Sequence, residues 1–189
     1  MENSARQNWI DAAIAAFRAG GVENVRVEAI ARELDVTKGS FYWHFRDRSE
    51  LLEAVIRAWE EETDWLIAHA LDAETPRARL IHYFALVPET RKRHPPDVEM
   101  LAWARRDAKV NRRVRAVEDK RIAFFERQLR LAGIRGKQAA LRARMAFLAS
   151  QGWIEQLSRG AHGGETFETF ATHLFDMVLK QPERKKAIP

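Results

Sequence analysis

A short stretch near the start of the chain gathers side chains that could bind nucleic acid. They are Lys38, Ser40, Tyr42, Trp43 and His44. A lysine can pair with a phosphate, while hydroxyl and imidazole groups can hydrogen-bond to phosphate oxygens or to the edges of bases. An ordinary solvated helix face would carry Glu, Lys or Gln in place of these large, polar-tipped residues. The residue types therefore point to a surface that could recognise DNA.

Two short helices would position these side chains. Apolar residues at helical spacing over 27–34 predict a first helix with one buried stripe. Asp35 and Val36 would turn the chain, and Thr37 would cap a second helix, from about residue 38 to 44, by accepting from the N–H of Ser40. The pattern fits a helix-turn-helix, whose second helix enters the major groove of DNA. An ordinary helical hairpin with a chance aromatic cluster fits the same residues.

The stretch from about Trp9 to Val55 resembles the N-terminal domain of the TetR family of bacterial transcriptional regulators. The matching runs are WIDAAIAAF, the glycine pair at 20 and 21, VEAIARELDVTKGSFYWHF and RDRSELLEAV. The run VTKGSFYWHF is close to the most specific signature of the family, so the resemblance favours the helix-turn-helix over the plain hairpin. It implies an all-α fold of about nine helices. The implied parts are a three-helix helix-turn-helix DNA-binding domain over 1–47, a helical ligand-binding and dimerisation domain over 48–182, and a flexible tail over 183–189.

The resemblance also implies which residues contact DNA. They are Arg26, Glu28, Thr37, Lys38, Gly39, Ser40, Tyr42, Trp43, His44 and Arg48. Arg26 stands where the family usually has a capping Ser or Thr, and it would place a cation near the DNA backbone. Glu28 is either a solvent-exposed residue that does not contact DNA or an acceptor for the N4 amino group of a cytosine. Arg48 would contact a phosphate.

The composition narrows the classes of function. Among the 189 residues there is no cysteine, which excludes disulfides, thiolate metal sites and a Cys nucleophile, and we expect no cofactor and no metal. The net charge is +5, but bases and acids are equal in number over residues 1–49, so attraction to phosphate must come from local placement and from helix N-termini. The basic run over 105–121 is expected to be a solvated face and not a second DNA site. Without an apolar run of about 18 residues or a signal-peptide pattern, we expect neither a membrane span nor secretion, and a location in the bacterial cytoplasm at the nucleoid.

Caps and breaks predict the remaining helices. Asp47 and Glu50 fit a capping box at the start of a long helix. Thr75 followed by Pro76 fits the start of the next one. A turn is expected near residues 109–111. In all, the sequence predicts helices over about residues 4–19, 27–34, 38–44, 48–70, 76–94, 97–108, 112–132, 136–158 and 165–180.

The C-terminal helices carry the candidate ligand-binding residues. They are Trp59, Glu62, Thr63, Leu66, His69, Tyr83, Phe84, Met100, Trp103, Arg121, Phe124, Phe125 and Met145. The pocket would be mainly apolar and aromatic, although plain core packing is the better explanation for any single aromatic. Arg121 lies inside an apolar stripe, so it would pair with an acid such as Glu62, meet an anionic ligand, or reach solvent by snorkelling. Glu62 would in turn suit a cationic ligand.

The eighth and ninth predicted helices are apolar on two sides, and such helices pack on two partners. One partner is the core of the same chain, and the other would be the same helix pair of a second copy. The expected dimer interface comprises Leu141, Leu148, Gly152, Phe167, Phe170, Ala171, Leu174 and Val178.

Together, these expectations predict a dimeric, ligand-responsive transcriptional regulator. Regulators of this family are most often repressors. Two reading helices about 34–36 Å apart would bind a pseudo-palindromic double-stranded DNA operator, and a small-molecule effector would release it. An alternative is a helical adaptor that binds a protein partner and has lost DNA binding. Catalysis is the least favoured alternative, because the chain has no nucleophile-elbow, zinc-protease, P-loop or dinucleotide motif and its histidines are scattered.

Overall fold

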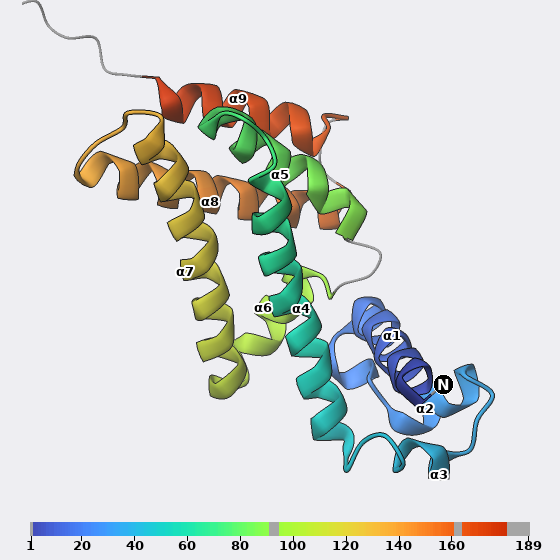
Figure 1. The fold of residues 1–189 in the computed structure, drawn as a ribbon. Coiled ribbons are helices and arrows are strands. Elements are labelled where there is room, and N and C mark those ends of the chain that lie inside the picture. The colour runs from blue at the N-terminus through green and yellow to red at the C-terminus, as the bar shows by residue number, and fades with distance from the viewer. Residues whose placement is uncertain (1, 91–94, 161–163, 181–189) are drawn as a thin grey trace, which may run out of the picture. The chain divides into compact units, whose positions relative to one another are not determined.

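The computed structural model describes residues 2–90, 95–160 and 164–180, and these residues form helices without any strand. The all-α fold expected from the sequence is confirmed. In chain order the elements are α1 (Glu2–Gly20), the 3-10 helix η1 (Val22–Asn24), α2 (Val27–Glu33), α3 (Lys38–Phe41), α4 (Arg48–Ala70), α5 (Pro76–Thr90), α6 (Asp97–Ala104), α7 (Ala108–Leu131), α8 (Lys137–Ser158) and α9 (Phe167–Leu179) (Figure 1). Among the described residues, no helix has the length and apolar character needed to cross a membrane. The predicted end of the fifth helix at residue 94 and the predicted tail over 183–189 lie outside the described residues.

The chain divides into two compact units. The first comprises Met1–Leu66 with Val87–Glu118, and the second comprises Ile67–Leu86 with Asp119–Pro189. The first unit is larger than the domain predicted over 1–47, because the start of α4, all of α6 and the start of α7 share its hydrophobic core. The functional boundary at residue 47 stays a prediction.

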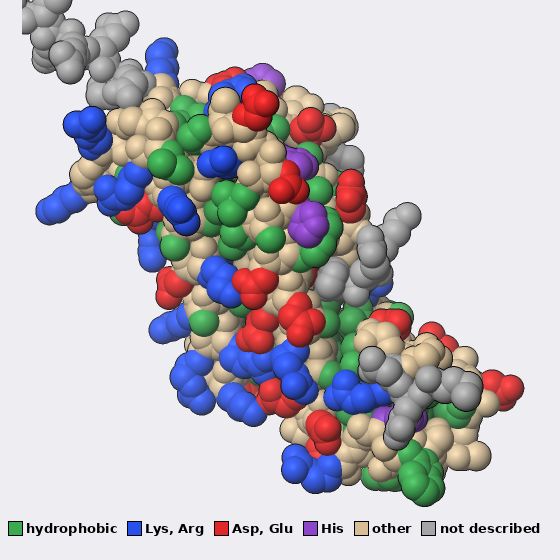
Figure 2. All heavy atoms as spheres, viewed as in Figure 1, with side chains coloured by type: hydrophobic (Ala, Val, Ile, Leu, Met, Phe, Trp, Pro, Cys, Tyr) green, Lys and Arg blue, Asp and Glu red, His purple; other side chains and the backbone are tan. Residues whose placement is uncertain are grey.

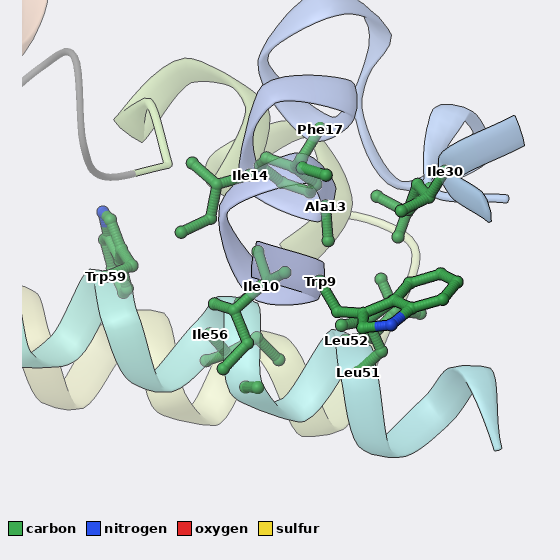
Figure 3. Packing of buried hydrophobic residues seen from close by; sticks show 14 of the residues in the cluster. Trp9, Ile10, Ala13, Ile14, Phe17, Ile30, Leu51, Leu52, Ile56 and Trp59 are labelled. Atoms are coloured by element: carbon green, nitrogen blue, oxygen red, sulfur yellow. The ribbon is translucent and has the colours of Figure 1, made fainter. Parts of the chain in front are cut away.

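The core of the first unit forms where α1 packs on α4. Figure 3 shows Trp9 and Ile10 of α1 pointing toward α4. Leu51, Leu52 and Ile56 of α4 meet them, and all five side chains are buried. Because burial of each such side chain contributes about 1.5–3 kcal/mol, this contact fixes the first helix against the fourth.

The turn between α2 and α3 depends on one residue whose backbone φ is positive, in the left-handed helical region. Asp35 has a φ of 53°, which Asp and Asn tolerate better than other residues that carry a side chain. The N–H of Val36 then donates to the carbonyl of Ala31 at 2.9 Å, which closes the end of α2. The chain therefore turns at the two residues that the sequence predicted, 35 and 36.

The second helix of the pair is shorter than predicted. α3 ends at Phe41, and residues 42–44 form a turn. The N–H groups of Tyr42, Trp43 and His44 each donate to the carbonyl three positions back, at 3.2, 3.3 and 3.0 Å, which is the tighter pattern of a 3-10 turn. The expected end of the helix at His44 is therefore wrong.

The break between α6 and α7 also differs from the prediction. It lies at residues 105–107 and not at 109–111. Asp107 sets the start of α7, because its Oδ1 accepts from the N–H of Lys109 at 2.8 Å and from that of Val110 at 3.1 Å. Aspartate is a strong N-cap, and here it is hidden inside a run of basic residues.

Carboxylates of α4 hold the first half of α7 within the first unit. Arg113 donates from Nε and Nη2 to the two carboxylate oxygens of Glu60 at 2.7 and 2.6 Å, and from Nη1 to Glu53 at 2.5 Å. Lys109 also pairs with Glu53 and holds the pKa of that carboxyl below its usual range. Figure 2 shows blue and red side chains adjoining over the lower parts of α4 and α7. Two bases of the run over 105–121 are therefore paired with carboxylates of α4, and the prediction that the run is a solvated face and not a second DNA site stays a prediction.

The second unit is built around aromatic rings. The ring of Phe84 on α5 lies 5.5 Å from that of Phe125 on α7 and 5.5 Å from that of Phe175 on α9, measured between centroids. The ring of Phe167 lies 4.9 Å from Phe84 and stacks on Trp153 of α8 at 4.6 Å. Rings from four helices therefore form one continuous core.

The left-handed conformation of Asp35 generates a stability prediction. Asp35→Val should lower the free energy of unfolding by about 1–2 kcal/mol, because a β-branched residue avoids positive φ. Asp35→Asn should stay within about 0.5 kcal/mol of the wild type, because Asn also enters this region. Urea unfolding followed by circular dichroism measures both. Equal midpoints for the Val and Asn variants would show that the turn imposes no such constraint.

Candidate functional site

The start of α3 is fixed by the cap that the sequence predicted. The Oγ1 of Thr37 accepts from the N–H of Ser40 at 3.3 Å, and the Oγ of Ser40 donates to the carbonyl of Thr37 at 2.8 Å. The cap satisfies one of the N–H groups that a helix start leaves unpaired. Thr37 and Ser40 therefore both help to hold the first turn of α3.

Two phenylalanines anchor this short helix to the core of the first unit. Phe41 and Phe45 are each 1 % exposed, and their rings stack with centroids 5.4 Å apart. Trp9 of α1 meets Phe41 edge-on at 5.2 Å, and the guanidinium of Arg6 lies 4.7 Å from the centroid of the Phe45 ring. The buried side of the segment is therefore fully packed.

The outward side of the same segment carries exposed aromatic residues. Tyr42 is 59 % exposed and Trp43 is 86 % exposed, whereas His44 is half-buried. Two neighbouring exposed aromatic side chains are unusual unless the surface contacts another molecule. Gly39 is not required by the fold, because an added Cβ would meet only Thr37 Oγ1, at an ordinary 3.6 Å. A glycine here allows another molecule to approach the backbone closely.

Glu28 and Lys38 form an ion pair on this surface. The Oε1 of Glu28, in the first turn of α2, lies 2.5 Å from the Nζ of Lys38, the first residue of α3. The hydrogen bond from Lys38 lowers the pKa of the Glu28 carboxyl, and the same bond raises the pKa of the Lys38 ammonium. The two alternatives expected for Glu28 were exposure without a DNA contact and a contact with a cytosine. Neither included a partner on α3.

Two arginines of the predicted DNA surface have different surroundings. Arg26 is the exposed N-cap of α2 and makes no capping hydrogen bond with its side chain, as its departure from the usual Ser or Thr led us to expect. Arg48 donates from Nε to the carbonyl of Val25 at 2.6 Å and from Nη2 to that of Val22 at 2.5 Å. Arg48 therefore has an internal role that the sequence did not reveal, and its phosphate contact stays a prediction.

This segment matches a known family. Residues 10–55 match the family model described as bacterial regulatory proteins, tetR family. The N-terminal domain belongs to the TetR family. The HTH-type transcriptional regulator SrpR of Pseudomonas putida is 47 % identical over 51 residues, which are 27 % of this chain and 24 % of SrpR. BetI of Pectobacterium carotovorum is 34 % identical over 90 residues, which are 42 % of this chain and 43 % of BetI. The chain therefore spans about a quarter of SrpR and under half of BetI.

Solved structures extend the likeness in fold to most of the chain. A TetR-like transcriptional regulator from Rhodococcus sp. RHA1 superposes with a TM-score of 0.63, at 22 % identity, over 92 % of each chain. The regulator FadR from Bacillus subtilis, in complex with stearoyl-CoA, superposes with a TM-score of 0.66, at 12 % identity, over 92 % of this chain and 97 % of FadR. These matches establish a TetR-like fold beyond the N-terminal domain.

The candidate ligand-binding residues fall in both units. In the first unit, Trp59, Met100 and Trp103 belong to or pack against the hydrophobic core. The indole N–H of Trp59 donates to Oδ1 of Asp97 at 2.6 Å, within the same unit. Three further candidates on α4 are buried: Glu62, Thr63 and Leu66. Core packing is a sufficient explanation for the apolar members, and a ligand contact stays a prediction for each.

In the second unit, four candidates interlock with one another. The ring of Tyr83 lies 5.6 Å from that of Phe124 and 5.4 Å from that of Phe125, and Phe84 meets Tyr83 at 5.2 Å. Arg121 is 6 % exposed, so of its three alternatives the escape to solvent by snorkelling is wrong.

Two other candidates of this unit lie nearer to solvent. His69 is half-buried, and Met145 is 56 % exposed on α8. In the single chain Met145 does not line an enclosed pocket, and its ligand contact stays a prediction.

Exposure separates the predicted dimer residues into two groups. On α8, Leu141 is 54 % and Leu148 is 61 % exposed, and Gly152 follows them on the same helix face. On α9, Phe170 is half-buried. The remaining members are covered within the single chain, namely Phe167, Ala171, Leu174 and Val178. Met177 of α9, 69 % exposed, was not among the residues predicted for the interface.

Gln128 of α7 is a buried polar residue that was not among the predicted ligand contacts. It is completely buried, and neither its amide nitrogen nor its amide oxygen has a hydrogen-bond partner. An unpaired buried amide is costly, which makes it a candidate for contact with a polar ligand atom. Its position inside the apolar stripe of α7 was the available signal. An open groove of about 280 Å³ between α6 and α7 is lined by both apolar and polar residues, and by none of the predicted ligand residues. In the described part of the chain, no cluster of three or more potential metal ligands occurs.

The unpaired amide of Gln128 gives a second stability prediction. Gln128→Met has nearly the same shape without the polar atoms, and it should raise the free energy of unfolding by about 1–2 kcal/mol. Thermal and urea unfolding measure the change, with exposed Arg127→Met on the same helix as the control. A loss of stability in Gln128→Met would show that the amide is satisfied in the folded protein.

Proposed function

We propose that this protein is a transcriptional regulator that binds double-stranded DNA through α3 and the turn that follows it. One observation carries the proposal. Side chains able to contact phosphates and bases are exposed on a segment whose other side is fixed by Phe41 and Phe45, within the part of the chain that matches the TetR family. Rigid placement of contact residues is what sequence recognition in the major groove requires. The site of action would be the bacterial cytoplasm, at the nucleoid.

The proposed regulator acts as a homodimer on a pseudo-palindromic operator. Leu141, Met145 and Leu148 are exposed at helical spacing on α8, and Gly152 would permit close approach of a second helix. An exposed apolar stripe of this kind is a candidate protein–protein contact. A two-fold dimer would place two copies of α3 about 34–36 Å apart, in successive major grooves.

The proposed regulator is a repressor that a small molecule releases. The effector must bind the DNA-incompetent state more tightly than the competent state, since equal affinity would shift nothing. FadR, which has a similar fold, was solved in complex with stearoyl-CoA, and this supports an effector for the present protein. Here Gln128 and the aromatic residues of the second unit are the proposed contacts for the effector, which would enter by displacing packed side chains.

DNA binding is tested by substituting residues on the exposed side of α3. Lys38→Ala and Tyr42→Ala should each weaken operator binding about 10-fold or more, because each loses a phosphate or base contact. The operator is first selected from a random duplex library with the wild-type protein, and affinity is then measured by fluorescence anisotropy. Arg127→Ala, a charge removed from exposed α7, serves as the control. Unchanged operator affinity in both α3 variants would refute the proposed reading surface.

The dimer is tested on the exposed stripe of α8. Leu148→Glu should give a monomer in sedimentation velocity, because a buried unpaired carboxylate is costly in an apolar interface. Operator affinity should fall about 100-fold, since two half-sites are no longer bound together. Leu131→Glu alters another leucine, 58 % exposed, that lies off the stripe and should leave the dimer intact. A dimer that survives Leu148→Glu would place the interface elsewhere.

A further inference from the structure

The ion pair between Glu28 and Lys38 lies on the surface that is proposed to face DNA. The carboxylate oxygen and the ammonium nitrogen are 2.5 Å apart, and the side chains of Lys38 and Glu28 are 52 % and 63 % exposed. The pair joins the first turn of α2 to the first residue of α3. It is therefore accessible to a DNA strand that lies against α3.

Lys38 provides the positive charge of the segment that is proposed to face DNA. It is the one Lys or Arg in the sequence from residue 38 to 45. Glu28 neutralises this charge in the free protein, and the charges of residues 1–49 also balance overall. The segment that would enter the major groove thus presents little net positive charge before DNA arrives.

We propose that Glu28 competes with DNA phosphates for Lys38 and thereby restrains sequence-independent DNA binding. This inference rests on the proposed DNA binding through α3. A phosphate that approaches Lys38 must replace the Glu28 carboxylate, so forming one ion pair costs another. The two groups support each other's ionised forms, with the pKa of Glu28 lowered and that of Lys38 raised by their shared hydrogen bond. The competition therefore persists at neutral pH.

The physical effect of this competition is measurable without knowing the operator. Non-specific affinity for DNA comes from phosphates that Lys and Arg side chains neutralise. Each neutralised phosphate contributes about −0.9 to the slope of the logarithm of the association constant against the logarithm of the salt concentration. While Lys38 remains paired with Glu28, it contributes nothing to that slope. Breaking one exposed ion pair changes an equilibrium constant, here that of DNA binding, about two- to fivefold.

The experiment measures binding of the full chain to a mixed-sequence duplex of about 30 base pairs at several salt concentrations. Glu28→Gln should bind about two- to fivefold more tightly per subunit at low salt, with a slope steeper by about 0.9 per subunit. Glu33→Gln is the matched control, because Glu33 is an exposed carboxylate on the same helix. Its removal changes net charge equally while leaving Lys38 paired.

A double-mutant cycle isolates the coupling between the two residues. In a Lys38→Met background, Glu28→Gln should no longer tighten binding or steepen the salt slope. The inference is overturned if Glu28→Gln matches Glu33→Gln, or if its effect persists without Lys38. It is also overturned if Glu28→Gln weakens only binding to the selected operator, since Glu28 would then read a base. If the wild type binds neither mixed-sequence DNA nor any selected duplex, the proposed function itself fails.

Discussion

The proposed DNA-binding surface depends on the burial of Phe41 and Phe45. α3 spans only Lys38–Phe41, and a helix of one turn has no stability of its own in water. The two stacked rings, with Trp9 edge-on to Phe41, tie the segment to α1 and thus to the core that α1 shares with α4. The exposed positions of Tyr42 and Trp43 follow from this anchoring, because the buried rings fix which side of the segment faces outward.

Local signals made the first unit largely predictable. The apolar stripe of α2, the turn at Asp35 and Val36 and the Thr37 cap each depend on neighbours within four positions. The predictions failed where two local signals competed. The run of basic residues concealed Asp107 as the cap of α7, and tight three-residue hydrogen bonds ended α3 at Phe41. Contacts between distant segments, such as Arg48 with the Val22 and Val25 carbonyls, leave no local trace in a sequence.

The second unit shows why the candidate ligand site was harder to predict. Apolar periodicity identifies buried residues, but it cannot distinguish a filled core from a pocket lined by the same side chains. Ring contacts connect Tyr83, Phe84, Phe124 and Phe125 into one cluster, which is the arrangement of a packed core. Gln128 differs from them because its amide gains nothing from that core. A polar residue inside an apolar stripe was therefore more informative than the aromatics around it.

The hydrogen bonds from Arg48 have a consequence for how such a protein can diversify. They join the first turn of α4 to η1 and to the loop residue Val25 that precedes α2. Any rotation of that turn would carry the loop with it. The side chain at position 48 is therefore constrained by these two carbonyls as well as by any phosphate that it would contact.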